Sequence, residues 1–229
     1  MADEKYFNVP VQLMEGFLAN DKAVLNKMLY YALYAHSEKM EFGNEAERFA
    51  ASANYFGVQI GSIKTAIKTG KELFNTTDDS SPMVGINLKV FWDYYKNHKP
   101  EFDKACLLAF LALRSILQKK SYCKIDNRFL LARMDGKARS CEFTALSEEV
   151  FKYANEYQTK KIKKALSDAW GLVTYSRYTR GFYVSFKLSL VDLVFEAEKR
   201  RESVKEKQRK DEVNDALQQA RERLGITRS

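Results

Sequence analysis

The residues with the most readily interpreted chemistry are the lysines between positions 158 and 170. Hydrophobic spacing predicts a helix there, with Ile162, Ala165, Leu166 and Ala169 on one face. The residues expected around the rest of the helix are Thr159, Lys160, Lys161, Lys163, Lys164 and Ser167. Lysines this close repel one another by about 0.2–0.5 kcal/mol per pair. A phosphate backbone would turn that repulsion into attraction through counterion release. The competing interpretation is a solvated face with no ligand.

A β-hairpin is predicted directly after this helix. Residues 172–178 and 182–188 have the alternation of two strands around Thr179-Arg180-Gly181. Arginines at the tip of such a hairpin can lie along a phosphate strand or in the minor groove, and tyrosine hydroxyls reach sugar-phosphate oxygens. The helix and hairpin together therefore predict a surface for double-stranded DNA. Its expected contact residues are Gln158, Thr159, Lys160, Lys161, Lys163, Lys164, Arg177, Tyr178 and Arg180.

Residues 49–67 carry a second candidate for DNA contact. Ala53 would let two helices approach, Gly57 would permit a positive φ at the bend, and Ile63 would fill the angle between the helices. With Val58, these residues resemble the helix-turn-helix fingerprint of many repressors and site-specific recombinases. The resemblance implies that outward residues of the second helix contact DNA, with a dimerisation role as the alternative. Those residues are Gln59, Ser62, Lys64, Thr65 and Lys68.

The two candidate helices also repeat in sequence. Residues 62–74 match residues 161–173 at an offset of 99 positions, and such repetition indicates two copies of one unit. The matched pairs are Ile63 with Ile162, Lys64 with Lys163, Ala66 with Ala165, and Leu73 with Leu172. The second copy carries an insertion between residues 120 and 145. Its basic rim, which includes Arg133 and Lys137, is expected to extend the DNA footprint.

These features predict a mainly α fold with small β-hairpins, of the α+β type. We expect an N-terminal winged-helix-like domain at residues 1–99, a basic C-terminal winged-helix domain at 100–197, and a charged helical or disordered tail at 198–229. Residues 1–103 hold 11 Lys and Arg against 14 Asp and Glu, a net charge of −3. Residues 104–229 hold 27 against 16, a net charge of +11, which assigns the polyanion-binding role to the second half.

The tandem arrangement resembles that of plasmid and phage replication initiators. The stretch Val9-Pro10-Val11-Gln12-Leu13 before a long helix is similar to the opening of some of these proteins. The resemblance implies a double-stranded DNA-binding protein that starts replication of a mobile element or phage. Its further partner would be a second copy of the chain or a component of the replication machinery. A transcriptional regulator of the same fold and a non-enzymatic interaction scaffold stay open as alternatives.

Other function classes receive little support from the sequence. The chain has no phosphate-binding Gly-Lys-Ser/Thr loop and no His/Cys/acid cluster, so we expect no enzyme activity, no catalytic residues, no cofactor and no metal. Cys106, Cys123 and Cys141 lack the spacing of a zinc site and are expected to pack as small hydrophobes. No apolar run approaches the ~18 residues of a membrane span, and no signal pattern is present, so a cytoplasmic location without membrane contact is expected.

Overall fold

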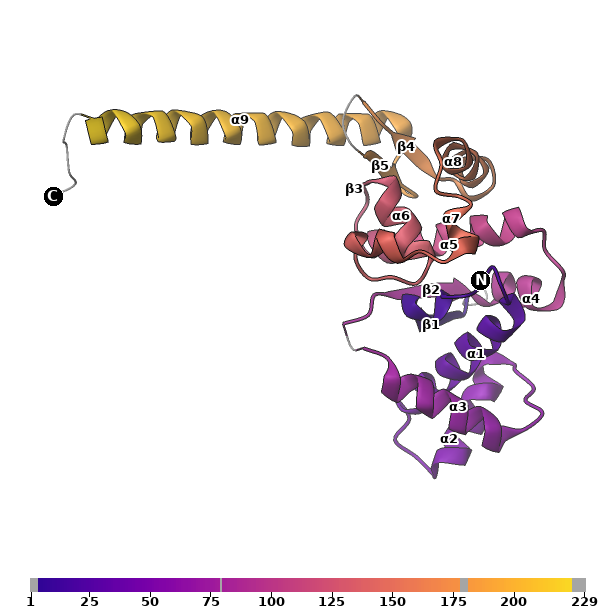
Figure 1. Cartoon of the computed structure of the whole chain (residues 1–229). Coiled ribbons are helices and arrows are strands. Elements are labelled where there is room, and N and C mark those ends of the chain that lie inside the picture. The colour runs from indigo at the N-terminus through magenta and orange to yellow at the C-terminus, as the bar shows by residue number, and fades with distance from the viewer. Residues whose placement is uncertain (1–3, 79, 178–180, 224–229) are drawn as a thin grey trace.

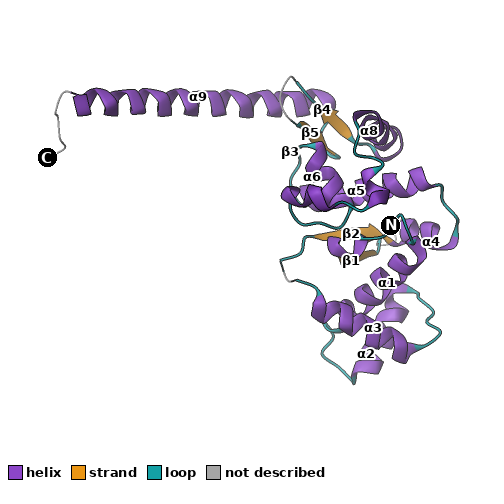
Figure 2. Ribbon diagram, viewed as in Figure 1, coloured by secondary structure: helices purple, strands orange, loops and turns teal. Residues whose placement is uncertain are grey.

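The computed structural model describes residues 4–78, 80–177 and 181–223 and shows a mainly helical chain with two small antiparallel sheets (Figures 1 and 2). The mainly α fold class predicted from the sequence is confirmed. The elements of the N-terminal half (residues 4–99) are β1 (Tyr6–Pro10), a 3₁₀ turn η1 (Val11–Met14), α1 (Asp21–Ser37), α2 (Glu45–Phe56), α3 (Ile63–Thr76), β2 (Met83–Asn87) and α4 (Leu88–Lys96).

The C-terminal half (residues 100–197) is richer in short elements. It comprises α5 (Glu101–Leu117), β3 (Cys123–Ile125), α6 (Asn127–Met134), a 3₁₀ turn η2 (Ser140–Ala145), α7 (Glu148–Phe151), α8 (Glu156–Trp170), β4 (Val173–Tyr175), β5 (Phe182–Ser185) and the start of α9 (Leu190–Arg223). The helix α7, with four residues, is a single turn.

The two sheets are built differently. In the first sheet, β1 pairs with β2 so that Phe7 faces Ile86 and Val9 faces Val84 across the ladder, and all four side chains are buried. These strands are separated by α1, α2 and α3, so the first sheet is a long-range pairing. The second sheet has the order β3-β5-β4 and contains the predicted hairpin, β4 with β5.

Local signals set the helix ends. Asn20 is the N-cap of α1, and its side chain accepts a hydrogen bond from the backbone N–H of Ala23 at 3.0 Å. Gly57 ends α2 in the left-handed region at φ 66°, as the helix-turn-helix pattern predicted. Gly171 ends α8 in the same way at φ 68°.

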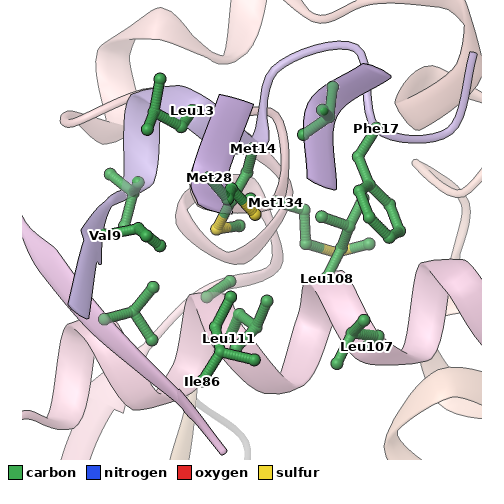
Figure 3. Close-up of a cluster of buried hydrophobic side chains, with 14 of the residues drawn as sticks. Val9, Leu13, Met14, Phe17, Met28, Ile86, Leu107, Leu108, Leu111 and Met134 are labelled. Carbon is green, nitrogen blue, oxygen red and sulfur yellow. The ribbon is translucent and has the colours of Figure 1, made fainter. Parts of the chain in front are cut away.

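One continuous hydrophobic core joins the two halves (Figure 3). Val9 and Ile86 from the first sheet lie close to Leu107 and Leu111 of α5, and Met134 of α6 reaches the same cluster. The helix α5 is almost entirely buried because apolar residues occupy every side of it between Ala105 and Leu113. The relative placement of the two halves therefore depends on packing around α5.

The insertion in the C-terminal half belongs largely to this core. Arg133 is only 4% exposed, and its guanidinium donates hydrogen bonds to the hydroxyl of Ser115 and to the carbonyls of Lys137 and Ala138. Lys137 forms an ion pair with Glu15 at 2.8 Å. The predicted basic rim is wrong at these two positions, because their charges are used inside the fold.

The helix α9 extends far beyond the rest of the molecule (Figure 1). Within it, Leu193 and Ala197 are buried, whereas every position from 202 to 219 is exposed. The sequence left a choice between a helical and a disordered tail, and the structure shows helix as far as Arg223. Among the described residues, no helix combines the length and apolar character needed to cross a membrane.

Candidate nucleic-acid interface

The helix α8 is positioned by a polar cap and an apolar face. The side chain of Asn155 accepts a hydrogen bond from the backbone N–H of Gln158 at 2.8 Å and so begins the helix. Ile162 and Leu166 are buried, and α8 packs against α5. Ala169, expected on the same face, is exposed, so the buried stripe is narrower than the sequence predicted.

Three of the four lysines of α8 are exposed. Lys160 forms an ion pair with Glu156 one turn earlier at 2.7 Å, but both side chains are at least 70% exposed, so water and salt weaken the pair. The ammonium group of Lys161 lies 4.4 Å from the ring centroid of Phe102 on α5. Lys164 is exposed as well. These three charges remain accessible to a polyanion.

Lys163 differs from its neighbours. Its ammonium group lies 4.1 Å from the ring centroid of Phe182 on β5 and 3.3 Å from the side-chain oxygen of Asn127 on α6. Burial, together with the positive charge of Lys160, lowers the pKa of this lysine. The prediction that Lys163 points outward is corrected, because it bridges α8, α6 and the hairpin.

Thr159 also departs from the predicted surface. Thr159 is 2% exposed, and its hydroxyl donates to the backbone carbonyl of Asn155 at 3.0 Å. The backbone carbonyl of Glu156 lies 3.1 Å from the same hydroxyl oxygen. A threonine whose hydroxyl bonds to its own helix can be buried at little cost. Gln158 is partly exposed.

The hairpin β4–β5 stands next to α8 in the fold (Figure 1). The hydroxyl of Ser176 donates to the carbonyl of Gly181 at 3.3 Å. Arg177 is exposed, and one of its terminal nitrogens lies 3.4 Å from a carboxylate oxygen of Glu198 on α9. Tyr178 and Arg180, two of the predicted contacts, lie outside the described residues.

A cavity of about 820 Å³ separates α8 from the hairpin and is called here the α8–hairpin groove. Its lining includes Asn127, Arg128, Asn155, Lys160, Lys163 and Ser176. Arg128 belongs to the basic rim that was expected to extend the DNA footprint. Asn127 and Asn155 were missed in the sequence because they stand at helix starts, and the places of these starts are known only from the fold. The mixture of cations, amides and hydroxyls suits sugar-phosphate oxygens and base edges.

The candidate contacts of the N-terminal half all lie at the surface. Gln59, Ser62, Lys64, Thr65 and Lys68 are exposed. Ser62 is the N-cap of α3: its hydroxyl oxygen lies 3.0 Å from that of Thr65 and 3.5 Å from the Thr65 backbone N–H. Lys68 lies 4.0 Å from Glu72 on the same helix. The structure therefore groups these residues over the first turns of α3 and the segment just before it, far from α8 (Figure 1).

Ile63 does not play its predicted part. Its side chain is 43% exposed, so it does not fill the angle between the two helices. Ala66 and Gly70, both buried, bring α3 against α1 instead. Ala53 is 7% exposed, as expected for a small residue at a helix contact.

Metal-ligand and thiol side chains do not cluster in the part of the chain that the structure describes. No group of three or more His, Cys, Asp or Glu side chains within it could hold a metal ion. Cys106 and Cys123 are buried, and burial raises the pKa of each thiol to about 11. The packing interpretation is confirmed for these two cysteines and is wrong for Cys141, which is exposed.

Comparison with family models, curated proteins and solved structures gives no significant match to this chain.

Proposed function

We propose that this chain is a double-stranded DNA-binding protein built from two winged-helix units. In the C-terminal half, α8 would enter the major groove while the β4–β5 hairpin contacts the neighbouring backbone. The observation that carries the proposal is the exposure of Lys160, Lys161 and Lys164 on α8, of which Lys160 also lines the α8–hairpin groove. An ion pair as exposed as that of Lys160 with Glu156 competes weakly with a phosphate.

The second half of the proposal concerns the biological role. The shared core around α5 would fix α3 and α8 relative to each other, so both helices would address one DNA molecule as a unit. Such rigid tandem units resemble replication initiators of plasmids and phages, which bind repeated origin sequences. We therefore assign the chain to replication initiation of a mobile element or phage. Exposed Val204, Val213 and Leu217 on α9 would contact a second copy or the replication machinery.

The test is duplex binding by the full chain, measured by fluorescence anisotropy. A double variant, Lys160→Gln with Lys164→Gln, should weaken binding about tenfold or more at low salt, because two phosphate contacts are lost. The matched control, Lys27→Gln with Lys39→Gln, removes two exposed lysines from the N-terminal half and should bind like the wild type. Equal binding by both variants would remove α8 from the interface.

Selection from a pool of random duplexes addresses the biological role. Rigid tandem units predict retained sequences with two adjacent motifs in fixed spacing. A single short motif, or no enrichment, would contradict the initiator assignment.

A further inference from the structure

A second groove lies on the opposite face of the β3-β5-β4 sheet. Along β5, Tyr183 stands between buried Phe182 and Val184, so it points away from the core. The ladder places Lys124 of β3 and Tyr175 of β4 directly beside Tyr183. The sheet therefore presents a cross-strand row of one lysine and two tyrosines on its outer face.

The rings in this row form a platform. Tyr175 and Tyr183 have centroids 6.5 Å apart and planes inclined by 30°, and Tyr122 lies 6.3 Å from Tyr183 on the other side. The ammonium group of Lys124 lies 5.9 Å from the Tyr183 centroid. Aromatic faces next to cations are the surface on which unpaired bases stack.

The helix α9 supplies the second wall of the groove. Its first turns pack against β4 and β5, with Leu193 and Ala197 buried, and the helix then leaves the sheet. The space between helix and sheet has a volume of about 390 Å³. Five cations line it, namely Lys124, Arg177, Arg200, Arg201 and Lys205. We call this space the tyrosine–arginine groove.

Glu198 is the one acidic residue among those that line the groove. Its carboxylate accepts a hydrogen bond from the Tyr175 hydroxyl at 2.8 Å and lies 3.4 Å from both Arg177 and Arg201. The Tyr175 hydrogen bond and the two arginine charges hold the pKa of Glu198 below its ordinary value. Three donors therefore already converge on one anion at this edge of the groove.

We infer that the tyrosine–arginine groove binds single-stranded nucleic acid. Bases stack on Tyr175 and Tyr183, while Arg200 and Lys205 on α9 hold the phosphates. A duplex cannot use this platform, because its bases are already stacked on one another and present no free face. The site goes beyond the proposed function, since it is separate from α8 and takes a different form of nucleic acid. A chain with both sites would hold a duplex and an opened strand together.

The experiment uses the full chain and labelled single strands of about 16 nucleotides, the upper end of usual site sizes. Binding is measured in parallel for DNA and RNA strands of the same sequence, and the strand that binds with higher affinity identifies the natural ligand. Tyr175→Ala should weaken binding about tenfold, because it removes one stacking face. Tyr175→Phe keeps the ring and should bind like the wild type, which separates stacking from the hydrogen bond to Glu198.

The charges are tested on exposed positions of α9, where folding is not at risk. Arg200→Gln with Lys205→Gln should weaken single-strand binding about tenfold and reduce its salt dependence. Lys207→Gln with Arg209→Gln removes the same charge outside the groove and should have no such effect. Glu198→Gln should tighten binding about threefold, because it removes a carboxylate charge that repels the phosphates.

The α8 duplex site and the tyrosine–arginine groove can be tested separately. Lys160→Gln with Lys164→Gln should weaken duplex binding and keep single-strand binding, whereas the groove variants should do the reverse. No binding to either single strand, or equal binding by Tyr175→Ala and the wild type, overturns the groove. Absence of duplex binding with intact single-strand binding overturns the proposed function alone.

Discussion

Replacing Gly70 by alanine tests the close crossing of α1 and α3. A Cβ atom at this position would lie 2.6 Å from the backbone oxygen of Tyr30 and 2.8 Å from the Cβ of Tyr34, both on α1. Overpacking costs about 1–3 kcal/mol, and a backbone oxygen cannot rotate away, so the upper end of this range applies. Alanine regains about 1 kcal/mol of helix propensity over glycine. The expected net loss is about 2 kcal/mol in the free energy of unfolding.

Urea denaturation followed by circular dichroism measures this loss. The matched control is Gly61→Ala in the connection before α3, where an added Cβ would meet nothing within 4 Å. The control should match the wild type or gain about 0.4–1 kcal/mol, because alanine restricts the unfolded chain. A Gly70→Ala protein as stable as the wild type would show that the two helices do not approach this closely.

Two further predictions concern the junction of the halves and the thiols. The ammonium group of Lys104 on α5 lies 2.9 Å from a carboxylate oxygen of Asp21 on α1, and both side chains are mostly buried. A double-mutant cycle with Asp21→Asn and Lys104→Met should therefore give a coupling energy of about 1–2 kcal/mol. Burial raises the pKa of Asp21, but the hydrogen bond and charge of Lys104 outweigh it and hold the pKa below 3.8. The stability difference between wild type and Asp21→Asn should therefore be constant above about pH 5 and shrink as the pH falls through the folded-state pKa; a difference that grows in acid would contradict the pair. In the native protein a thiol reagent should modify exposed Cys141 rapidly, and should modify Cys106 and Cys123 only after denaturant is added. Rapid labelling of all three cysteines without denaturant would contradict the burial of Cys106 and Cys123.

The helices with strong local signals were predicted well from the sequence. The α8 helix was expected at residues 158–170 and runs from Glu156 to Trp170. The positive φ at Gly57 was also predicted, because few other residues tolerate that conformation at a helix end. In these places, spacing and capping chemistry determine structure within a few residues of the chain.

Contacts between distant segments could not be predicted in this way. Lys163 has the sequence pattern of a surface lysine, but the ring that covers it comes from Phe182 on a later strand. The repeat at an offset of 99 pairs Ile63 with Ile162, although the first is exposed and the second is buried. The two positions carry the same residue type, but the burial of each depends on which face of α3 packs against α1 and which face of α8 packs against α5.

The pairing of β1 with β2 is a further long-range feature. Nothing local indicates that Phe7 meets Ile86, because three helices separate the two strands in the sequence. The alignment of Tyr175 with Tyr183 could likewise not be predicted from the sequence. Alternation predicted strands on either side of Gly181, but the register that aligns Tyr175 with Tyr183 follows from the folded sheet.

The salt dependence of duplex binding tests the central claim most directly. The slope of log K against log salt changes by about 0.9 for each phosphate contact on DNA. Replacing the exposed lysines of α8 with Lys160→Gln, Lys161→Gln and Lys164→Gln should therefore make the slope shallower by about 2.7. A slope equal to that of the wild type would mean that α8 does not contact the DNA backbone.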